Sequence, residues 1–520
     1  MLLFALLLVG VVACDDDEDD MIIPEIPTTG MSNTFTLNAV DNPSISGTAK
    51  LEELEDGTSK LTLDLNGTSS GNMHPAHIHF NTAAEGGGIA VSLSAVDGAT
   101  GMSETIISAL DDGTAITYNQ LLNFDGYINV HQSVSDLATL VAQGDIGQNA
   151  LTGDMMNYDL ASVADPNISG TATFAKRMNN ETLVTLALTG TPDGSMHPAH
   201  IHFNTAAEGG GIAVSLGAVD GTSGMKKTNV AMLDDGTAIT YDELINYDGY
   251  INVHLSAEDL ATLVAQGDIG QNALTGDMMN YDLASVADPN ISGTATFAKR
   301  MNNETLVTLA LTGTPDGSMH PAHIHFNTAA EGGGIAVSLG AVDGTSGMKK
   351  TNVAMLDDGT AITYDELINY DGYINVHLSA EDLATLVAQG DIGQNALTGE
   401  SVTYDLGEKD VTGISGTITF SQRMNGESLA VIELIGITEG NHPAHIHAGS
   451  VAEAPGGILI SLTPVNAMGM SKTNIAMNDA EETISYEALT NIDGYVNVHA
   501  SAEDLATLLA QGNVGSNAVE

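Results

Sequence analysis

The chain repeats one unit of about 123 residues four times in tandem. Residues 148–270 and 271–393 are identical letter for letter, and more divergent copies precede and follow them. A unit of this length is too long for a solenoid repeat of roughly 20–50 residues, but it has the size of a small domain. The sequence therefore predicts four independent domains in a row, each with its own hydrophobic core.

The spacing of the copies also predicts where the domains begin and end. We expect domains at residues 32–154, 155–277, 278–400 and 401–520, after a leader at residues 1–14 and a tether at residues 15–31. The junctions between copies are as short as Gly270-Gln271-Asn272-Ala273. Such short connections favour a semi-rigid row of domains.

Each copy contains short runs rich in Val, Ile, Leu and Thr that are bounded by Gly, Asn, Asp or Pro. In the second copy these runs are residues 158–163, 168–176, 182–189, 199–203, 212–219, 227–233 and 250–254. Seven short strands in about 120 residues are typical of an antiparallel sandwich or flattened barrel. We therefore predict an all-β chain of four antiparallel Greek-key-type β-sandwich or barrel domains, each with one or two short helices.

Two helix starts are indicated in the second copy. Thr240–Glu243 and Ser256–Asp259 each place a hydroxyl at a possible N-cap and a carboxylate three residues later. We expect a short helix at each place, and we expect the second to continue as far as Gly267. Both helices would flank the run that ends at His254.

All sixteen histidines of the chain belong to one pattern that occurs once per copy. A His-Pro-Ala-His-Ile-His segment is followed some fifty residues later by Gly-Tyr-(Ile/Val)-Asn-Val-His. Alternate side chains of a strand share a face, so His200 and His202 would point the same way and Ile201 the opposite way. If the strand that ends at His254 lies nearby, a site with three imidazole nitrogens results. Nitrogen-only donors favour copper or zinc over calcium or magnesium.

The candidate metal ligands are therefore three histidines per copy. They are His77, His79 and His131 in the first copy, His200, His202 and His254 in the second, His323, His325 and His377 in the third, and His445, His447 and His499 in the fourth. Tyr250 precedes His254 by four residues and shares its strand face; we interpret it as a core residue.

The remaining histidine of each copy directly precedes a proline. These residues are His74, His197, His320 and His442. Proline lacks a backbone donor, so we expect Pro198 to exclude a regular central strand and to place His197 in a turn beside the ligand pair. We assign these four histidines to the orientation of a ligand and not to ligation.

The net charge of the chain is −54, from 67 acidic and 13 basic residues. Such a surface repels phosphate backbones, which excludes nucleic acid as a partner class. Acidic runs such as Leu233-Asp234-Asp235-Gly236 lack the spacing of a calcium loop and are typical of turns. We therefore expect no dedicated calcium site.

The N-terminus predicts a membrane attachment. Residues Met1–Ala13 form an almost unbroken apolar stretch that ends in Val-Val-Ala before Cys14, and Asp15–Asp20 is entirely acidic. The stretch is too short for a spanning helix and resembles a signal peptide with the lipobox of bacterial lipoproteins, in which the cysteine is lipidated. The resemblance implies an outer-membrane or cell-surface lipoprotein that is anchored by lipid on Cys14 and works outside the cytoplasm.

The fourth copy carries the clearest family resemblance. Ala444–Gly449 reads Ala-His-Ile-His-Ala-Gly, a Gly-rich segment follows at Gly456–Leu462, and Tyr495–His499 reads Tyr-Val-Asn-Val-His. This pattern resembles the chordin-type (CHRD) domain, whose bacterial members carry a His-Ile-His, a Gly-rich segment and a later Tyr-Val-Asn-Val-His. The resemblance extends over each repeat from end to end.

Each copy also has a weaker similarity to copper-zinc superoxide dismutase, an eight-stranded Greek-key barrel. There too a His-x-x-His-x-His segment precedes a distant histidine and an acidic stretch, which His254 and Ala257–Leu260 resemble. The similarity implies that His77, His79 and His131, with their counterparts, bind copper and that the first histidine of each copy forms a structural hydrogen bond.

Several parts of that dismutase have no counterpart in this sequence. Four histidines per copy leave none to bridge copper and zinc, and only a short Gly-rich turn lies between Phe203 and Ile212, where a zinc-binding loop would be. The single cysteine, Cys14, forms no intrachain disulfide, and no arginine follows the last histidine within a copy to guide an anion. The negative charge would repel superoxide. These differences favour metal binding over turnover.

Three functions from different classes stay open. The chain is a metal-binding extracellular module, a copper-only dismutase-like redox enzyme, or an adhesion or partner-binding array whose histidines are structural. A histidine in a strand commonly has a structural role, whereas clustering of all sixteen in one pattern favours metal. The metal content of the protein, and then a superoxide assay, distinguish the three.

Overall fold

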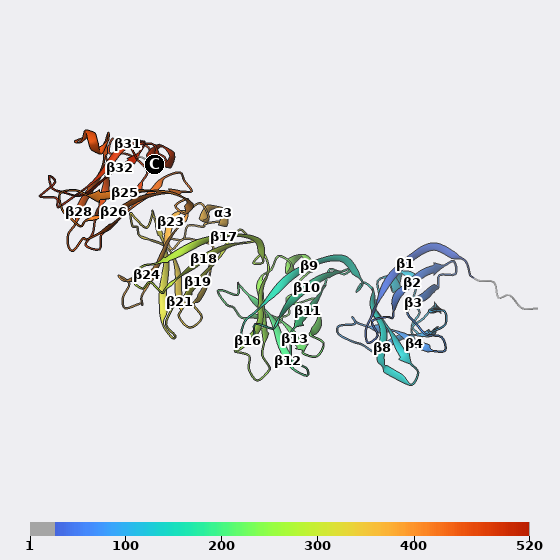
Figure 1. The fold of residues 1–520 in the computed structure, drawn as a ribbon. Coiled ribbons are helices and arrows are strands. Elements are labelled where there is room, and N and C mark those ends of the chain that lie inside the picture. Colours follow the sequence, from blue (N-terminus) through green and yellow to red (C-terminus); the bar gives the residue numbers. More distant parts are fainter. Residues whose placement is uncertain (1–25, 519–520) are drawn as a thin grey trace, which may run out of the picture.

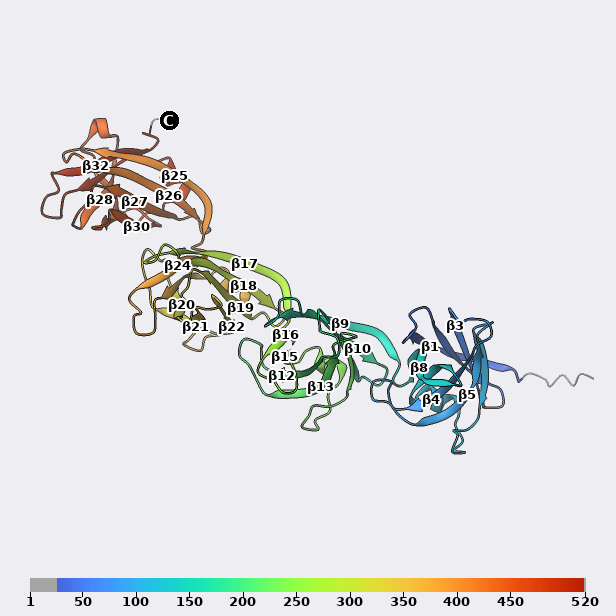
Figure 2. The same ribbon diagram turned by 60° about the horizontal axis from the view of Figure 1, so that its bottom comes forward.

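The computed structural model describes residues 26–518, and Figures 1 and 2 show these as four β-barrels that follow one another in a row. The predicted leader, Cys14 and the first part of the tether lie outside the described residues. Among residues 26–518, no helix is both long and apolar enough to cross a membrane. The all-β fold class predicted from the sequence is confirmed.

The first two barrels have eight strands each. The first contains β1 (Thr28–Ala39), β2 (Ser46–Leu54), β3 (Ser59–Asn66), β4 (Met73–Phe80), β5 (Ile89–Asp97), β6 (Met102–Ile107), α1 (Tyr118–Leu122), β7 (Asp125–Ser133) and β8 (Asp136–Gly147). The second contains β9 (Leu151–Ser162), β10 (Ser169–Arg177), β11 (Thr182–Thr189), β12 (Met196–Phe203), β13 (Ile212–Asp220), β14 (Met225–Val230), α2 (Tyr241–Leu244), β15 (Asp248–His254) and β16 (Leu263–Gly270).

The third and fourth barrels repeat this order. The third contains β17 (Leu274–Ser285), β18 (Ser292–Arg300), β19 (Thr305–Thr312), β20 (Met319–Phe326), β21 (Ile335–Asp343), β22 (Met348–Val353), α3 (Tyr364–Leu367), β23 (Asp371–His377) and β24 (Leu386–Gly393). The fourth contains β25 (Leu397–Glu408), β26 (Ser415–Arg423), β27 (Ser428–Ile435), β28 (His442–Ala448), the 3₁₀ turn η1 (Val451–Glu453), β29 (Ile458–Val465), β30 (Met470–Ile475), α4 (Tyr486–Thr490), β31 (Asp493–His499) and β32 (Leu508–Gly515).

Each barrel is a Greek key. In the first, the strand order is β1-β2-β3-β6-β5-β4-β7-β8, and β8 pairs with β1 to close the barrel. Strands β4, β5 and β6 follow one another, and the long connection that carries α1 then returns β7 to lie beside β4. The fourth sheet has the same order, but its end strands β29 and β30 do not pair as a ladder; at this seam the Thr463 amide donates to the Thr473 hydroxyl at 2.8 Å. This topology places the two histidine-bearing strands side by side.

Alternation of apolar and polar residues explains why these segments form strands around a core. In β11, Val184, Leu186 and Leu188 point inward and are buried, whereas the residues between them are only partly covered. Each barrel encloses its own cluster of buried apolar side chains, with Phe174 and Ile201 in the second barrel. The four domains therefore have separate cores.

The structure places the domain boundaries a few residues earlier than the sequence does. The predicted second domain begins at residue 155, but β9 begins at Leu151, where it pairs with Arg177 of β10. The third and fourth barrels begin in the same way at Leu274 and Leu397. The long first strand of each barrel thus starts directly after the junction, because its first residues already form a sheet with the next strand.

Of the two helices expected in the second copy, only the first is present. α2 starts after Thr240, whose hydroxyl accepts from the Glu243 amide in a capping box. The Ser256–Asp259 segment forms a turn, and the residues after it form β16 instead of a continued helix. These residues form a strand because β16 pairs with both β15 and β9 and so closes the barrel.

Pro198 lies inside strand β12, contrary to the expectation that it excludes a strand there. It pairs with Ala218 of β13 on one side. The pairing of β12 with β15 on the other side begins only at Ala199. Pro198 therefore sits where β12 has one neighbour, so its missing N–H breaks no hydrogen bond of the ladder.

Candidate metal centre

Two neighbouring strands position the three candidate ligands of each domain. In the second domain, β12 pairs with β15 so that Ala199 faces Val253 and His202 faces Tyr250. Ile201 of β12 is fully buried and points into the barrel, so His200 and His202 lie on the outer face of the sheet. The centre is therefore built on the outside of a rigid barrel wall, and its ligands come from both strands.

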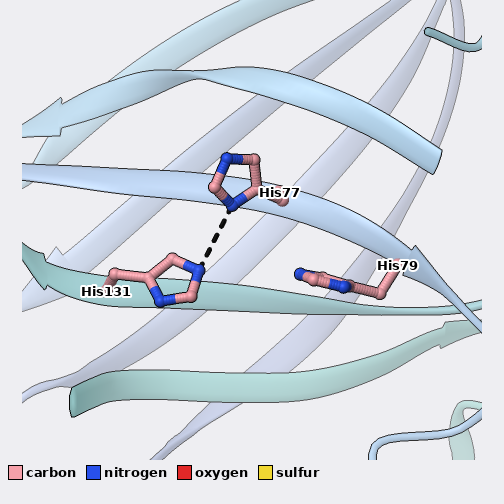
Figure 3. Close-up of side chains that lie close together, drawn as sticks. All are labelled: His77, His79 and His131. Atoms are coloured by element: carbon pink, nitrogen blue, oxygen red, sulfur yellow. Dashed lines mark hydrogen bonds between the residues drawn. The ribbon is translucent and has the colours of Figure 1, made fainter. Parts of the chain in front are cut away.

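The structure brings together the three predicted ligands of every copy, with ligand nitrogens that all lie within 4.8 Å of one another. Figure 3 shows His77 and His79 of β4 and His131 of β7 facing a common point in the first domain. The groups are His77, His79 and His131; His200, His202 and His254; His323, His325 and His377; and His445, His447 and His499. Strand adjacency, which the sequence left as a condition, is thus met in all four domains.

Backbone carbonyls fix the orientation of two imidazoles in each domain. The Nδ1 of His79 lies 3.0 Å from the Gly87 carbonyl, and the Nδ1 of His131 lies 2.7 Å from the Leu137 carbonyl. A carbonyl only accepts, so each Nδ1 carries the proton and donates. The lone pair of each Nε2 is then free and directed toward the centre, as in histidines that bind metals.

The third imidazole, that of His77 in the first domain, faces the centre with its Nδ1 and not with its Nε2. The Nδ1 of His77 lies 3.2 Å from the Nε2 of His131, and the same contact is 3.1 Å in the second domain. One proton shared between the two nitrogens satisfies this distance. A shared ion satisfies it equally, since nitrogens about 2.0–2.1 Å from one metal at angles of roughly 90–110° are about 2.9–3.4 Å apart.

The fourth domain lacks this contact between two histidines. The Nδ1 of His445 and the Nε2 atoms of His447 and His499 are buried and have no hydrogen-bond partner within residues 26–518. These three nitrogens are the ones that face the centre, since the Nδ1 atoms of His447 and His499 contact the Gly456 and Leu505 carbonyls. The residues therefore fit a cation that accepts three nitrogen lone pairs.

A Gly-rich loop and a tyrosine cover one imidazole of the centre. In the second domain, the ring of Tyr250 stacks on His202 with centroids 5.0 Å apart, and the Gly210 amide donates to the Tyr250 hydroxyl at 3.1 Å. A Cβ on Gly210 would lie 2.0 Å from the Phe203 carbonyl oxygen, so only glycine allows this close approach. Glycine is thus required where the loop presents its carbonyl to His202.

Tyr250 is buried, as the interpretation from the sequence expects, but it lies on the outer face of the barrel wall. It packs beneath the loop and does not belong to the apolar cluster inside its barrel. The strand face that it shares with His254 indicated this position. The Gly-rich loop that covers this face lies about forty residues away in the chain, so the sequence did not show that the face was covered.

In the first three copies, the histidine that precedes the proline forms a hydrogen bond to the backbone of the last histidine of the copy. The Nδ1 of His197 donates to the carbonyl of His254 at 3.1 Å, and its Nε2 lies 2.8 Å from the Ser195 hydroxyl. His74 and His320 make the same contact with the carbonyls of His131 and His377. His442 instead contacts the Ala500 carbonyl. None of the four belongs to a ligand group within the described part of the chain.

Burial favours the neutral form of two imidazoles in each centre. Burial lowers the pKa of His200 below its usual value of 6.5, the nearby His254 and His202 lower it further, and the Asp234 carboxylate opposes the shift. Burial also lowers the pKa of His254, against its hydrogen bond to the Leu260 carbonyl. The same directions hold in the other three domains. Neutral imidazole is the form that binds metal.

An acidic residue lies near each centre. Asp234 accepts from the amide and the hydroxyl of Ser215 at 2.9 and 2.7 Å, and Ser215 pairs with His200 across the sheet. The sequence indicated only a turn at this acidic run. The structure adds that one of its carboxylates contributes negative charge near the half-buried ligand, which favours a bound cation.

The comparisons with known proteins leave the family open. No protein-family model matches the chain, and no curated protein matches it. The similarity to CHRD domains therefore stays a prediction from sequence motifs, and the site is argued from its own geometry.

Proposed function

We propose that this protein binds one transition-metal ion in each of its four domains, copper in preference to zinc, and holds it without turnover. The observation that carries the proposal is the fourth triad, where three buried ring nitrogens face one point and have no partner among residues 26–518. Each buried unpaired polar atom costs about 1–3 kcal/mol. Coordination of one cation would satisfy all three nitrogens together.

The donor set supports copper or zinc. Three neutral imidazoles without thiolate or carboxylate suit these borderline metals and do not suit calcium or magnesium. His200 is only half-buried, so a bound ion keeps one side toward solvent. The chain supplies three oriented nitrogens and excludes water from the barrel side of the centre.

We further propose that the chain is a tandem CHRD-type lipoprotein, held at the outer membrane or cell surface by lipid on Cys14. The motifs around Cys14 and the His-Ile-His segments support this. The row of barrels in Figure 1 would then extend the centres away from the membrane. A Cys14→Ser variant should lose fatty-acid labelling and membrane association, and unchanged membrane association would contradict the anchor.

The metal proposal is tested on the four-domain chain. After equilibrium dialysis against copper or zinc, elemental analysis should find close to four ions per chain. The His202→Ala variant should lose one ion, whereas His197→Gln should keep four, because His197 supports His254 without reaching the centre. A metal content near zero in the unmodified chain would contradict the proposal.

Two other functions have specific observations in their favour. The solvent-facing side of His200 is compatible with redox turnover, and the His200 to His254 contact of 3.1 Å is compatible with purely structural histidines. Dismutase activity should rise with ionic strength, because salt screens the repulsion between superoxide and a chain of net charge −54. A structural role predicts no bound metal.

A further inference from the structure

Three arginines are buried at the junctions between domains. Each is the last residue of the second strand of a barrel, is fully buried, and contacts an aspartate of the preceding barrel at 2.8 Å. The pairs are Arg177 with Asp145, Arg300 with Asp268, and Arg423 with Asp391. Every junction between the described barrels therefore contains one buried ion pair.

Each arginine is held by its own domain and reaches into the one before. The Nε of Arg300 donates to the Asn352 side chain at 2.8 Å, and the Asn352 amide donates in turn to Glu304. The Nη1 of Arg300 contacts both the Asp268 carboxylate and the Asn272 carbonyl of the preceding domain. One guanidinium thus connects a fixed point of the third barrel to two points of the second.

Asp268 and Asn272 both form hydrogen bonds to the loop between β12 and β13, which covers the metal centre. The second oxygen of Asp268 accepts from the Ala206 amide at 2.8 Å. The side-chain amide of Asn272 donates to the Asn204 carbonyl at 3.0 Å. Asn204 and Ala206 are the first residues of the loop, so the arginine of the next domain holds its start through two contacts.

The same loop presents the carbonyl that orients a ligand. Gly210 accepts from the Nδ1 of His202 at 3.0 Å, and its amide donates to Tyr250, which pairs directly with Asp268 across the sheet. Arg300 is therefore connected to His202 by the hydrogen bonds of Asp268 to Arg300 and Ala206, by the loop backbone from Ala206 to Gly210, and by the hydrogen bond of Gly210 to His202. None of these hydrogen bonds exceeds 3.0 Å.

The two ends of the row lack the ion pair in a consistent way. Leu54 occupies the arginine position in the first barrel, at the end of β2. Asn513 occupies the aspartate position in the fourth, where it pairs with Tyr495 and accepts from the Val451 amide at 2.8 Å. The fourth domain therefore keeps the contact to the loop through Asn513. Because Asn513 is uncharged, it needs no guanidinium as a partner.

We propose that Arg177, Arg300 and Arg423 are positioning residues for the metal centres of the domains that precede them. The first three centres are then set by two domains each, whereas the fourth is set by its own domain through Asn513. This inference rests on the proposed metal function. It makes the affinity of a centre depend on attachment to the next barrel.

The identical second and third domains provide a matched test on the full chain. In one parent, only the second triad is intact, through His79→Ala, His325→Ala and His447→Ala; in the other, only the third is intact, through His79→Ala, His202→Ala and His447→Ala. Arg300→Leu or Arg423→Leu is added to each parent. Copper affinity and the electron paramagnetic resonance spectrum of bound Cu(II) are measured.

We expect a crossed result. Arg300→Leu should weaken copper binding about 10–100-fold and change the spectrum in the second-triad parent, with little effect in the third-triad parent, and Arg423→Leu should do the reverse. The double variant Asp268→Asn with Arg300→Leu, which copies both ends of the row, should recover affinity. Equal losses in both parents, or a loss confined to the third-triad parent, would overturn the inference, since Arg300 would then act through the general stability of the chain or of its own barrel. No recovery by the double variant would overturn it as well, since the loss would then not come from the unpaired Asp268 carboxylate.

A metal-free measurement separates this inference from the proposed function. In the Arg177→Leu chain, amide hydrogen exchange at Ala83, which donates to Asp145 at 2.7 Å, should be faster than in the parent. The first domain has a sequence of its own, so its peptides are assigned without ambiguity. Unchanged exchange overturns the positioning role. Absence of copper binding in both parents, with faster exchange, overturns the metal function alone.

Discussion

The fourth domain and the three before it hold the same triad, but they differ in the contact between two of its histidines. In the second domain, His200 and His254 contact each other at 3.1 Å, whereas His445 and His499 leave their facing nitrogens without partners in the described chain. Both domains keep the Gly-loop carbonyl, the distal leucine carbonyl and the stacked tyrosine. The comparison teaches that backbone carbonyls, and not the contact between histidines, orient the rings.

The largest difference between the two kinds of domain should come from the junction charge. Asp145→Ala leaves Arg177 fully buried without its carboxylate, and we expect a loss of about 3–5 kcal/mol in the free energy of unfolding of the adjoining barrels. Asn513→Ala removes an uncharged acceptor and should cost about 0.5–1.5 kcal/mol. Hydrogen exchange at increasing urea concentration measures both. Equal losses of stability in the two variants would contradict the distinction between the charged junctions and the uncharged end of the row.

The loop glycine should matter equally in both kinds of domain. A Cβ at Gly87 or Gly456 would lie about 2 Å from a backbone carbonyl oxygen, so alanine there should cost about 1–3 kcal/mol and displace the carbonyl that orients the ligand. Gly88 and Gly457 are matched controls, because no atom of the described residues lies within 4 Å of an added Cβ. Copper titration of chains with one intact triad measures the effect. Loss of affinity in the controls would contradict the account.

All four centres should share one pH dependence. Burial lowers the pKa of His200 and His445 below 6.5, so the neutral form is favoured in the folded protein and protons compete with metal only at lower pH. Copper affinity should change little between pH 8 and pH 7. It should fall as the pH drops below 6.5 through the lowered pKa, by up to about tenfold per pH unit for each of the two imidazoles whose pKa burial lowers.

Calorimetric titration of chains with one intact triad measures this dependence. A steady fall in affinity from pH 8 to pH 6.5 would show that the imidazoles titrate at or above their usual value. That result would contradict the burial of the centre.

The smallest effect should come from the side chain that contacts the histidine before the proline, which is His197 in the second domain. Ser195→Ala removes the 2.8 Å contact to His197 in the second domain and should cost about 0.5–1.5 kcal/mol of stability, with almost no change in copper affinity. In the fourth domain, the Glu439 carbonyl takes this place at 2.7 Å. A large loss of copper affinity in Ser195→Ala would assign His197 a direct part in the centre.

The strand pattern and the histidine spacing predicted most of the fold and the grouping of three histidines in each domain. Alternation in segments such as Thr182–Thr189 indicates strands, and the His-x-His of β12 places two imidazoles on one face without knowledge of the fold. The junction bridge was not predictable in this way. Arg300 and Asp268 are 32 residues apart and lie in different barrels, and only the arrangement of two domains brings them together.

The helix expected after Ser256 shows the opposite case, in which local signals mislead. Ser256 does cap a turn, since the Asp259 amide donates to its hydroxyl at 3.2 Å. The residues that follow belong to strand β16, where Ala265 and Gln266 pair with β9 and close the barrel. Tertiary pairing overrides this helix signal because an isolated helix of about ten residues gains little stability on its own.

The central claim is that three nitrogens of each domain bind one metal ion, and anomalous X-ray diffraction from copper-loaded crystals of the four-domain chain tests it most directly. The account predicts one anomalous peak per domain, about 2.0–2.1 Å from the Nδ1 of His200 and the Nε2 atoms of His202 and His254, and likewise at the other three triads. Peaks confined to surface carboxylates, or triads without a peak at saturating copper, would contradict it.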